Sequence, residues 1–123
     1  MSSLDISKLV DLQKEFDENH GWSHNSSSIS EKMDFISKDI IGLVGEIGEF
    51  SNLIKKLNLI NNRFSEDELN EKFTELHPDL KEELIDAFIY LIRISSHLNM
   101  DISKEYLRKY NINKGRFKKY ENK

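Results

Sequence analysis

Two pairs of carboxylates stand out, because each pair has the spacing that places its members on one helix face. Glu46 and Glu49 form the first pair, and Glu83 and Asp86 the second. Side chains three residues apart are neighbours on a helix. Carboxylates gathered away from water raise each other's pKa values and need a counter-cation, and all-oxygen ligand sets favour Mg²⁺, or Mn²⁺, over zinc or copper. The pairs predict a metal site in which these four side chains are ligands and catalytic residues.

The same two pairs have a simpler interpretation. Glutamates three residues apart are common on solvated helices, and Lys55, Lys56 and Lys81 could neutralise them. The second pair, however, lies in the apolar run from Lys81 to Ile94. A charge taken out of water is strongly penalised unless it is paired, so this run favours a buried partner for its two acids.

A basic segment near the end of the sequence offers the other half of such a site. Lys109, Asn113 and Arg116 have spacings of four and three, which aligns them on one side of a helix. They are the predicted phosphate ligands, with Lys55 as a weaker candidate, because arginine binds phosphate through a planar fork and lysine as a point charge. Residues 104–123 carry eight Lys or Arg against two Glu, although the net charge of the chain is −4. This asymmetry suits a polyanion carried with a divalent cation, and equally a solvated basic tail.

Trp22 and three glycines are further candidates for ligand contact. Trp22 is the only tryptophan and lies in a turn-rich stretch, where it either closes the edge of the core or stacks on a nucleobase. Gly42, Gly45 and Gly48 fall within a helical pattern, at a cost of up to about 1 kcal/mol each relative to alanine. Either another helix approaches closely there, or a bulky ligand needs the space.

The elements that must position these side chains are predicted to be helices. One proline and five glycines in 123 residues leave few turns, and a hydrophobic fraction of 37% suits a small core under a charged exterior. We expect an all-α protein, an antiparallel bundle of about four to five helices. It forms a single domain, residues 1–123, with a basic C-terminal helix or tail over residues 103–123.

Capping signals and apolar spacing predict the helix boundaries. A first amphipathic helix covers residues 4–19, and Ser28 with Glu31 opens a long helix toward Asn58. The apolar line of this long helix is expected to face the core: Ile36, Ile40, Leu43, Ile47, Phe50 and Ile54. Residues 58–63 should break the pattern, and Ser65 with Glu68 should then open a short polar helix over 65–76. The segment 77–79 should separate that helix from the buried one, and Asp101 or Ser103 should cap the last.

Cysteine content and charge exclude several classes of protein. The absence of cysteine rules out disulfide bridges and thiolate metal sites. The start does not resemble a signal peptide and the longest apolar run is too short to span a bilayer, so a soluble, cytoplasmic protein without a membrane partner is expected. A net charge of −4 argues against general nucleic-acid binding. His20 and His24 flank Gly21, which spoils a helical metal pair, and they are interpreted as surface residues.

Three motifs resemble the MazG-type, all-α nucleoside triphosphate pyrophosphohydrolases. They are Gly45-Glu-Ile-Gly-Glu-Phe50, Glu82-Glu-Leu-Ile-Asp-Ala-Phe-Ile-Tyr90 and Lys109-x3-Asn113-x2-Arg116, in that order over residues 8–117. Two features depart from the family pattern. Gly45 stands where many members carry another glutamate, and the 33 residues between Glu49 and Glu83 exceed the usual gap.

The resemblance implies Mg²⁺-dependent cleavage of a nucleoside triphosphate, or deoxynucleoside triphosphate, to the monophosphate and pyrophosphate. It also implies assembly as a homodimer or homotetramer and metal binding by the four carboxylates. The segment that contains Phe16 and His20-Gly21-Trp22 is similar to the aromatic loop of the dCTP-cleaving branch, which makes Trp22 a candidate for base stacking. We expect a water activated by Mg²⁺ to attack between the α- and β-phosphates, while Lys109 and Arg116 stabilise the leaving pyrophosphate.

Two other classes of protein compete with this hypothesis. A non-catalytic helical interaction module would use its acidic and basic faces only for assembly. A di-iron carboxylate bundle would need Glu-x-x-His pairs on its helices, and the sequence contains none.

Overall fold

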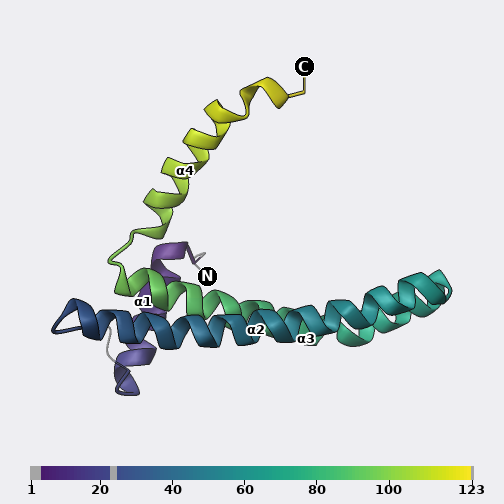
Figure 1. Ribbon diagram of the computed structural model, residues 1–123, viewed down its shortest axis with the longest axis horizontal. Helices are drawn as coiled ribbons and strands as arrows, with labels where there is room; N and C mark the ends of the chain where they lie inside the picture. The colour runs from purple at the N-terminus through teal and green to yellow at the C-terminus, as the bar shows by residue number, and fades with distance from the viewer. Residues whose placement is uncertain (1–3, 23–24, 123) are drawn as a thin grey trace.

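The computed structural model describes residues 4–22 and 25–122 and is all-α, as predicted. These two ranges form four α-helices and no strand, and their arrangement can be followed in Figure 1. The helices are α1 (Ile6–Asn19), α2 (Ile29–Arg63), α3 (Glu66–His97) and α4 (Ile102–Arg116), followed by a 3-10 turn, η1 (Lys118–Tyr120).

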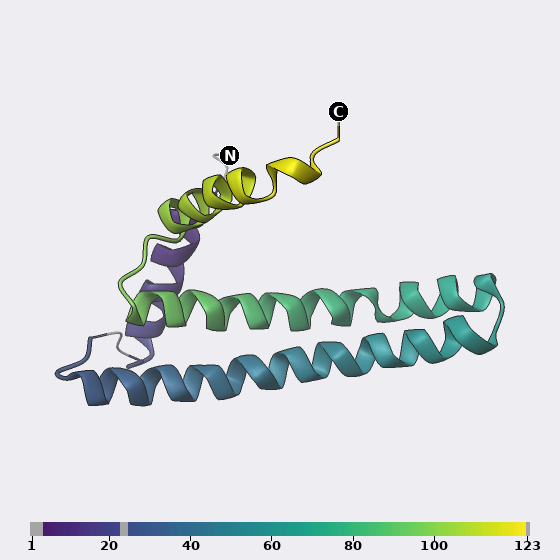
Figure 2. The same ribbon diagram turned by 45° about the horizontal axis from the view of Figure 1, so that its top comes forward.

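The fold is dominated by a long antiparallel hairpin of α2 and α3, which lie side by side along their whole length (Figures 1 and 2). Ser65 ends the short connection between them and caps α3, accepting a hydrogen bond from the backbone N–H of Glu68 at 3.3 Å. Leu57, Leu76 and Leu80 are buried together in the half of the hairpin nearer its tip. This packing holds the two carboxylate-bearing helices in one fixed register.

Both predicted interruptions of the hairpin are wrong. Helix α2 continues through residues 58–63, and α3 runs through Pro78 without a break. A proline within a helix removes one backbone hydrogen bond and costs about 3 kcal/mol. Leu76 and Leu80 lie on either side of Pro78 and are both buried against α2. We attribute the continuity of α3 to this packing, which offsets the local cost.

The helix starts predicted at Ser28, Ser65 and Asp101 are confirmed by their capping hydrogen bonds, whereas no helix starts at residues 77–79. The Ser28 hydroxyl accepts from the N–H of Glu31 at 3.1 Å. Asp101, rather than Ser103, caps α4 by accepting from the N–H of Lys104 at 3.2 Å. Such caps satisfy N–H groups that have no partner within the helix.

The two flanking helices pack at one end of the hairpin. Helix α1 crosses α3, and the left-handed residue Gly21 (φ 75°) ends the turn that follows it. Helix α4 packs against α1 and points away from the hairpin (Figure 2). Asn99 (φ 54°) makes the turn between α3 and α4.

Much apolar surface stays exposed in the single chain. Its accessible area is 9800 Å², whereas a compact monomer of 14.5 kDa should expose about 6900 Å². The apolar line of α2 only partly faces the core, because Ile40 and Ile47 are 45% and 53% exposed. Within the described residues, no helix has the length and apolar character needed to cross a membrane.

Candidate functional site

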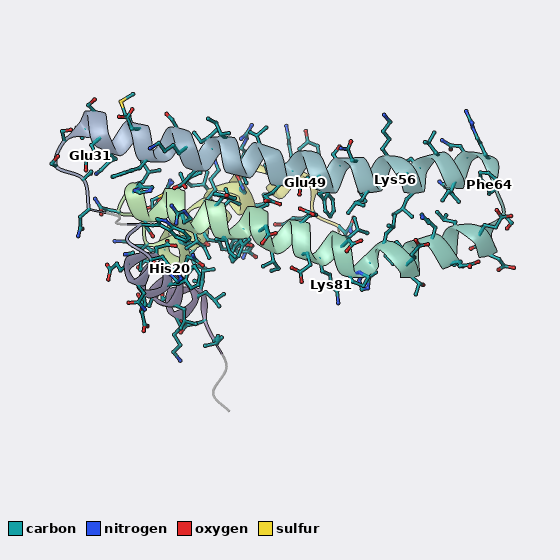
Figure 3. The ribbon with its side chains drawn as sticks, turned by 90° about the horizontal axis from the view of Figure 1, so that it is seen from below. His20, Glu31, Glu49, Lys56, Phe64 and Lys81 are labelled. Carbon is teal, nitrogen blue, oxygen red and sulfur yellow. The ribbon has the colours of Figure 1, made fainter. Side chains whose placement is uncertain are left out.

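Three of the four predicted carboxylates meet between the two long helices. Glu46 and Glu49 on α2 and Glu83 on α3 each place one carboxylate oxygen within 4.8 Å of the others. Glu46 and Glu49 differ by about 60° around the helix and so share the side that faces α3. Figure 3 shows Glu49 midway along the hairpin, between the α1 end at His20 and the tip at Phe64. We call these three residues the carboxylate cluster.

The carboxylate cluster is electrostatically strained. One oxygen of Glu46 and one of Glu83 are buried and have no hydrogen-bond donor. The pKa of Glu83 is raised to about 8, first because its protonated form hydrogen-bonds to Glu46 and Glu49, then because of burial and the negative charges of those two residues. Such a group holds its proton at neutral pH unless a cation replaces it.

The donor set of the carboxylate cluster fits a hard divalent cation. Mg²⁺ and Mn²⁺ are bound by oxygen ligands, usually one or two carboxylates together with water and substrate phosphates. The two buried oxygens without a donor supply lone pairs that a cation would satisfy. Glu46, Glu49 and Glu83 are therefore the residues that could hold such an ion.

Asp86 lies beside the carboxylate cluster rather than in it. It is half-buried on α3, one turn after Glu83, and is not among the three carboxyl groups that converge. Asp86 and Glu46 instead line one wall of a pocket of about 650 Å³, a volume suited to a small organic ligand. The other residues that line this pocket are Gln13, Phe16, Asp17, Trp22, Lys38, Asp39, Ile89, Tyr90 and Arg93.

Trp22 occupies the α1 side of this pocket. It is 51% exposed, so it does not close the edge of the core. Its ring stacks on His20, with centroids 5.2 Å apart, and lies 6.1 Å from the ring of Phe16. His20 is exposed, as expected, whereas His24 lies outside the described residues. The pocket thus has an aromatic wall from α1 and its following turn, and an acidic wall from the hairpin.

A buried network of charged residues forms the floor between these walls. Arg93 on α3 pairs with Asp17 on α1 at 2.8 Å and with Asp39 on α2 at 3.0 Å. Asp39 also contacts His97 at 3.1 Å. Asp17, Asp39 and His97 are at most 4% exposed. This network ties three helices together directly beneath the pocket.

The glycines of α2 have different roles. A side chain on Gly42 would collide with the ring of Tyr90, whereas Gly45 and Gly48 face open space in the single chain. Close approach of the neighbouring helix therefore explains Gly42. Tyr90 lines the pocket, so its packing on Gly42 also shapes that wall.

The predicted phosphate ligands lie away from the carboxylate cluster of their own chain. Lys109 and Arg116 are exposed and Asn113 is half-buried, all on α4, which packs against α1 and not along the hairpin. Lys55 is about 180° around α2 from Glu46 and points away from the cluster. A single chain therefore does not bring these side chains to the carboxylates.

The simpler interpretation of the acids as lysine-paired surface groups also receives no support. Among the described residues, Lys55, Lys56 and Lys81 form no ion pair with any member of the carboxylate cluster.

Sequence reasoning missed most of the pocket and the charged network. The missed residues are Gln13, Asp17, Lys38, Asp39, Tyr90, Arg93 and His97. One signal was present, because Arg93 is a charged residue within an apolar run and needs buried partners. Its partner Asp39 is 54 residues away, and no local pattern links the two.

Comparisons with known proteins found no match among protein-family models, curated proteins or solved structures.

Proposed function

We propose that the protein is a Mg²⁺-dependent pyrophosphohydrolase that acts on a nucleoside triphosphate, with a deoxynucleoside triphosphate as the preferred substrate. The observation that carries this proposal is the convergence of Glu46, Glu49 and Glu83 from two helices, with two buried oxygens that have no donor. The resemblance of the three sequence motifs to MazG-type enzymes points to the same chemistry.

The shape of the pocket suggests how a nucleotide would lie in it. Glu46 and Asp86 are on the acidic wall, where a phosphate chain would lie with its divalent cation. Trp22 and Phe16 are on the other wall, and a flat base would contact an aromatic surface there. A nucleotide in this orientation would extend from the carboxylate cluster to Trp22 in the turn after α1.

The residues of the chain would divide the work of hydrolysis. Glu46, Glu49 and Glu83 would hold Mg²⁺, and Asp86 would complete the acidic wall. When bound, Mg²⁺ supplies neutralisation of phosphate charge and acidification of water. Glu83 would give up its proton as the cation binds, because a cation favours the ionised carboxylate. The products would be a nucleoside monophosphate and pyrophosphate.

A second copy of the chain is the proposed source of Lys109, Asn113 and Arg116. These residues do not reach the carboxylates of their own chain, and among the described helices α4 packs mainly against α1. Helix α4 exposes apolar side chains as well as its basic ones, with Tyr106, Leu107 and Tyr110 each more than half exposed. A basic helix on one copy complements the acidic hairpin of another, and burying both would reduce the excess exposed area. A homodimer or homotetramer follows from this arrangement.

The function can be tested by incubating the purified protein with each common NTP and dNTP in the presence of Mg²⁺ and separating the products. Release of a monophosphate and pyrophosphate supports the proposal. Release of orthophosphate would assign the chain a different cleavage, and no turnover of any nucleotide would refute the proposal.

Mixing two inactive variants tests the contribution of the second copy. Glu49→Gln removes a carboxylate, and the double variant Lys109→Ala, Arg116→Ala removes the cations. If α4 acts on a neighbouring copy, co-refolding the two variants restores part of the activity, because some assemblies pair an intact cluster with an intact α4. Activity that stays absent in the mixture means that α4 does not complete the site of another copy.

A helical assembly module remains the second candidate, favoured by the apolar surface exposed on α2 and α4. It predicts a melting temperature unchanged by Mg²⁺ with any nucleotide. The pyrophosphohydrolase instead predicts stabilisation, because a ligand that binds only the folded state raises its stability.

A further inference from the structure

Arg93 is the hub of the charged network under the pocket. Its Nη1 donates to Asp17 at 2.8 Å and its Nε donates to Asp39 at 3.0 Å. Its guanidinium also lies over the ring of Trp22, 5.9 Å from the ring centroid. This one side chain on α3 therefore contacts α1, α2 and the turn that carries the only tryptophan.

Asp17 ties the backbone of the same turn to the network. It is fully buried, and its backbone carbonyl accepts the N–H of Trp22 at 2.8 Å. Its carboxylate accepts hydrogen bonds from Arg93 and from the amide of Gln13, the latter at 2.9 Å. Trp22 is thus held through its backbone by Asp17, and its ring lies between the stacked ring of His20 and the guanidinium of Arg93.

We propose that Arg93 is a positioning residue that fixes Trp22 as the aromatic wall of the pocket, so that a nucleobase meets a surface already in place. This inference rests on the proposed function for the identity of the ligand. The hold of Arg93 on Trp22 exists without any ligand and can be tested separately.

A direct phosphate-binding role for Arg93 fits the geometry less well. Two carboxylates neutralise its guanidinium, and its side chain is only 19% exposed. An arginine whose guanidinium is already paired with two carboxylates stabilises the packing of the helices and has few N–H groups left for phosphate. Trp22 is half exposed and follows Gly21, and the exposed ring of His20 is its other stacking partner, so loss of Arg93 would leave the Trp22 ring free to sample more orientations.

The first test uses fluorescence of the ligand-free protein, in which Trp22 is the only tryptophan. Arg93→Met removes the guanidinium, Arg93→Lys keeps a charge without the planar fork, and Arg63→Met makes the same change at the far tip of the hairpin. We expect faster acrylamide quenching and lower emission anisotropy in both Arg93 variants, with Arg93→Met the more affected. Arg63→Met should match the wild type.

The second test measures steady-state kinetics with the best nucleotide. Arg93→Lys should raise KM about tenfold, the size of one lost base-stacking contact, with a smaller change in kcat. In a Trp22→Leu background, the same Arg93→Lys change should have little further effect on KM, because residues that act through one another are not additive.

The outcomes separate this inference from the proposed function. Unchanged quenching and anisotropy in Arg93→Lys, with circular dichroism showing an intact fold, would overturn the positioning role even if the enzyme is active. An additive effect on KM in the Trp22→Leu background would also overturn it. Altered emission in a protein without nucleotide turnover would support the hold on Trp22 while refuting the pyrophosphohydrolase. If Arg93→Met does not fold, Arg93→Lys supplies the same readouts.

Discussion

Glu83 on α3 lies against Glu46 on α2, and each has one buried oxygen without a hydrogen-bond donor. Glu49 belongs to the same cluster, in which the carboxylate oxygens lie within 4.8 Å of one another. At this distance three ionised carboxylates would repel one another. The raised pKa of Glu83, about 8, expresses this conflict. A bound divalent cation would resolve it by neutralising the ionised carboxylates.

The stability of the metal-free protein should fall as pH rises from about 4.5 to about 8. Glu83 has a pKa of about 8 when folded, against 4.5 as its ordinary value. In this window the folded state holds a proton that the unfolded state has lost, so the free energy of unfolding decreases with pH. Mg²⁺ should raise the melting temperature more above pH 8 than well below it, because it competes with that proton. A Mg²⁺ effect that is equal at both pH values would contradict the coupling.

Glu83→Gln should stabilise the metal-free protein above pH 8 and remove its response to Mg²⁺. Glutamine keeps the shape and can donate to the neighbouring acids without adding a charge. Glu82→Gln, on the exposed side of the same turn, is the matched control and should keep the wild-type response. Thermal melts with and without Mg²⁺ measure both effects. A Glu83→Gln protein that Mg²⁺ still stabilises would exclude Glu83 as a ligand.

Glu49→Gln and Asp86→Asn should each abolish turnover while leaving the fold intact. Both changes remove a negative charge and keep the side-chain volume, so circular dichroism and melting temperature should stay near the wild-type values. Product release from a Mg²⁺–nucleotide mixture is the measurement. Full activity in either variant would mean that its carboxylate takes no part in the reaction.

Gly42→Ala should destabilise the protein by about 1–3 kcal/mol, the usual cost of overpacking. The added methyl group would meet the ring of Tyr90. Gly45→Ala, one turn further along α2, has open space around it and should be neutral or stabilising by up to about 1 kcal/mol. Urea unfolding of the two variants gives the comparison. Equal stability of both would argue against close packing of Tyr90 on α2.

Asp39→Ala should destabilise the protein by about 3 kcal/mol, because it leaves Arg93 with one of its two carboxylates and removes one partner of His97. Asp34→Ala, at an exposed position on the same helix, should change stability by less than about 0.5 kcal/mol. Chemical denaturation of both variants measures the difference. Similar losses of stability in the two variants would show that the buried charged network stabilises the fold no more than an exposed charge does.

Local sequence signals predicted the features of the fold that depend on local chemistry. Ser28, Ser65 and Asp101 cap helices because their side chains accept backbone N–H groups three residues later. The convergence of Glu46, Glu49 and Glu83 also follows, once two amphipathic helices pack antiparallel.

Features set by tertiary packing could not be predicted in this way. Local propensity placed a break at Pro78, but burial of Leu76 and Leu80 on α2 keeps α3 continuous. The alignment of α3 along α2 places Asp86 beside the carboxylate cluster instead of within it. The spacing of apolar residues within each helix does not specify this alignment. The direction of α4 depends on its contact with α1, which the sequence does not encode locally.

The most direct test of the metal site is a crystal structure grown with Mn²⁺ and a slowly hydrolysed nucleotide, with anomalous scattering recorded to locate the ion. We predict an anomalous peak within about 2.5 Å of carboxylate oxygens from Glu46, Glu49 and Glu83, with the phosphates beside Asp86. A structure with ordered nucleotide and no peak at these three residues, or with the peak elsewhere, would contradict the metal site proposed for this hairpin.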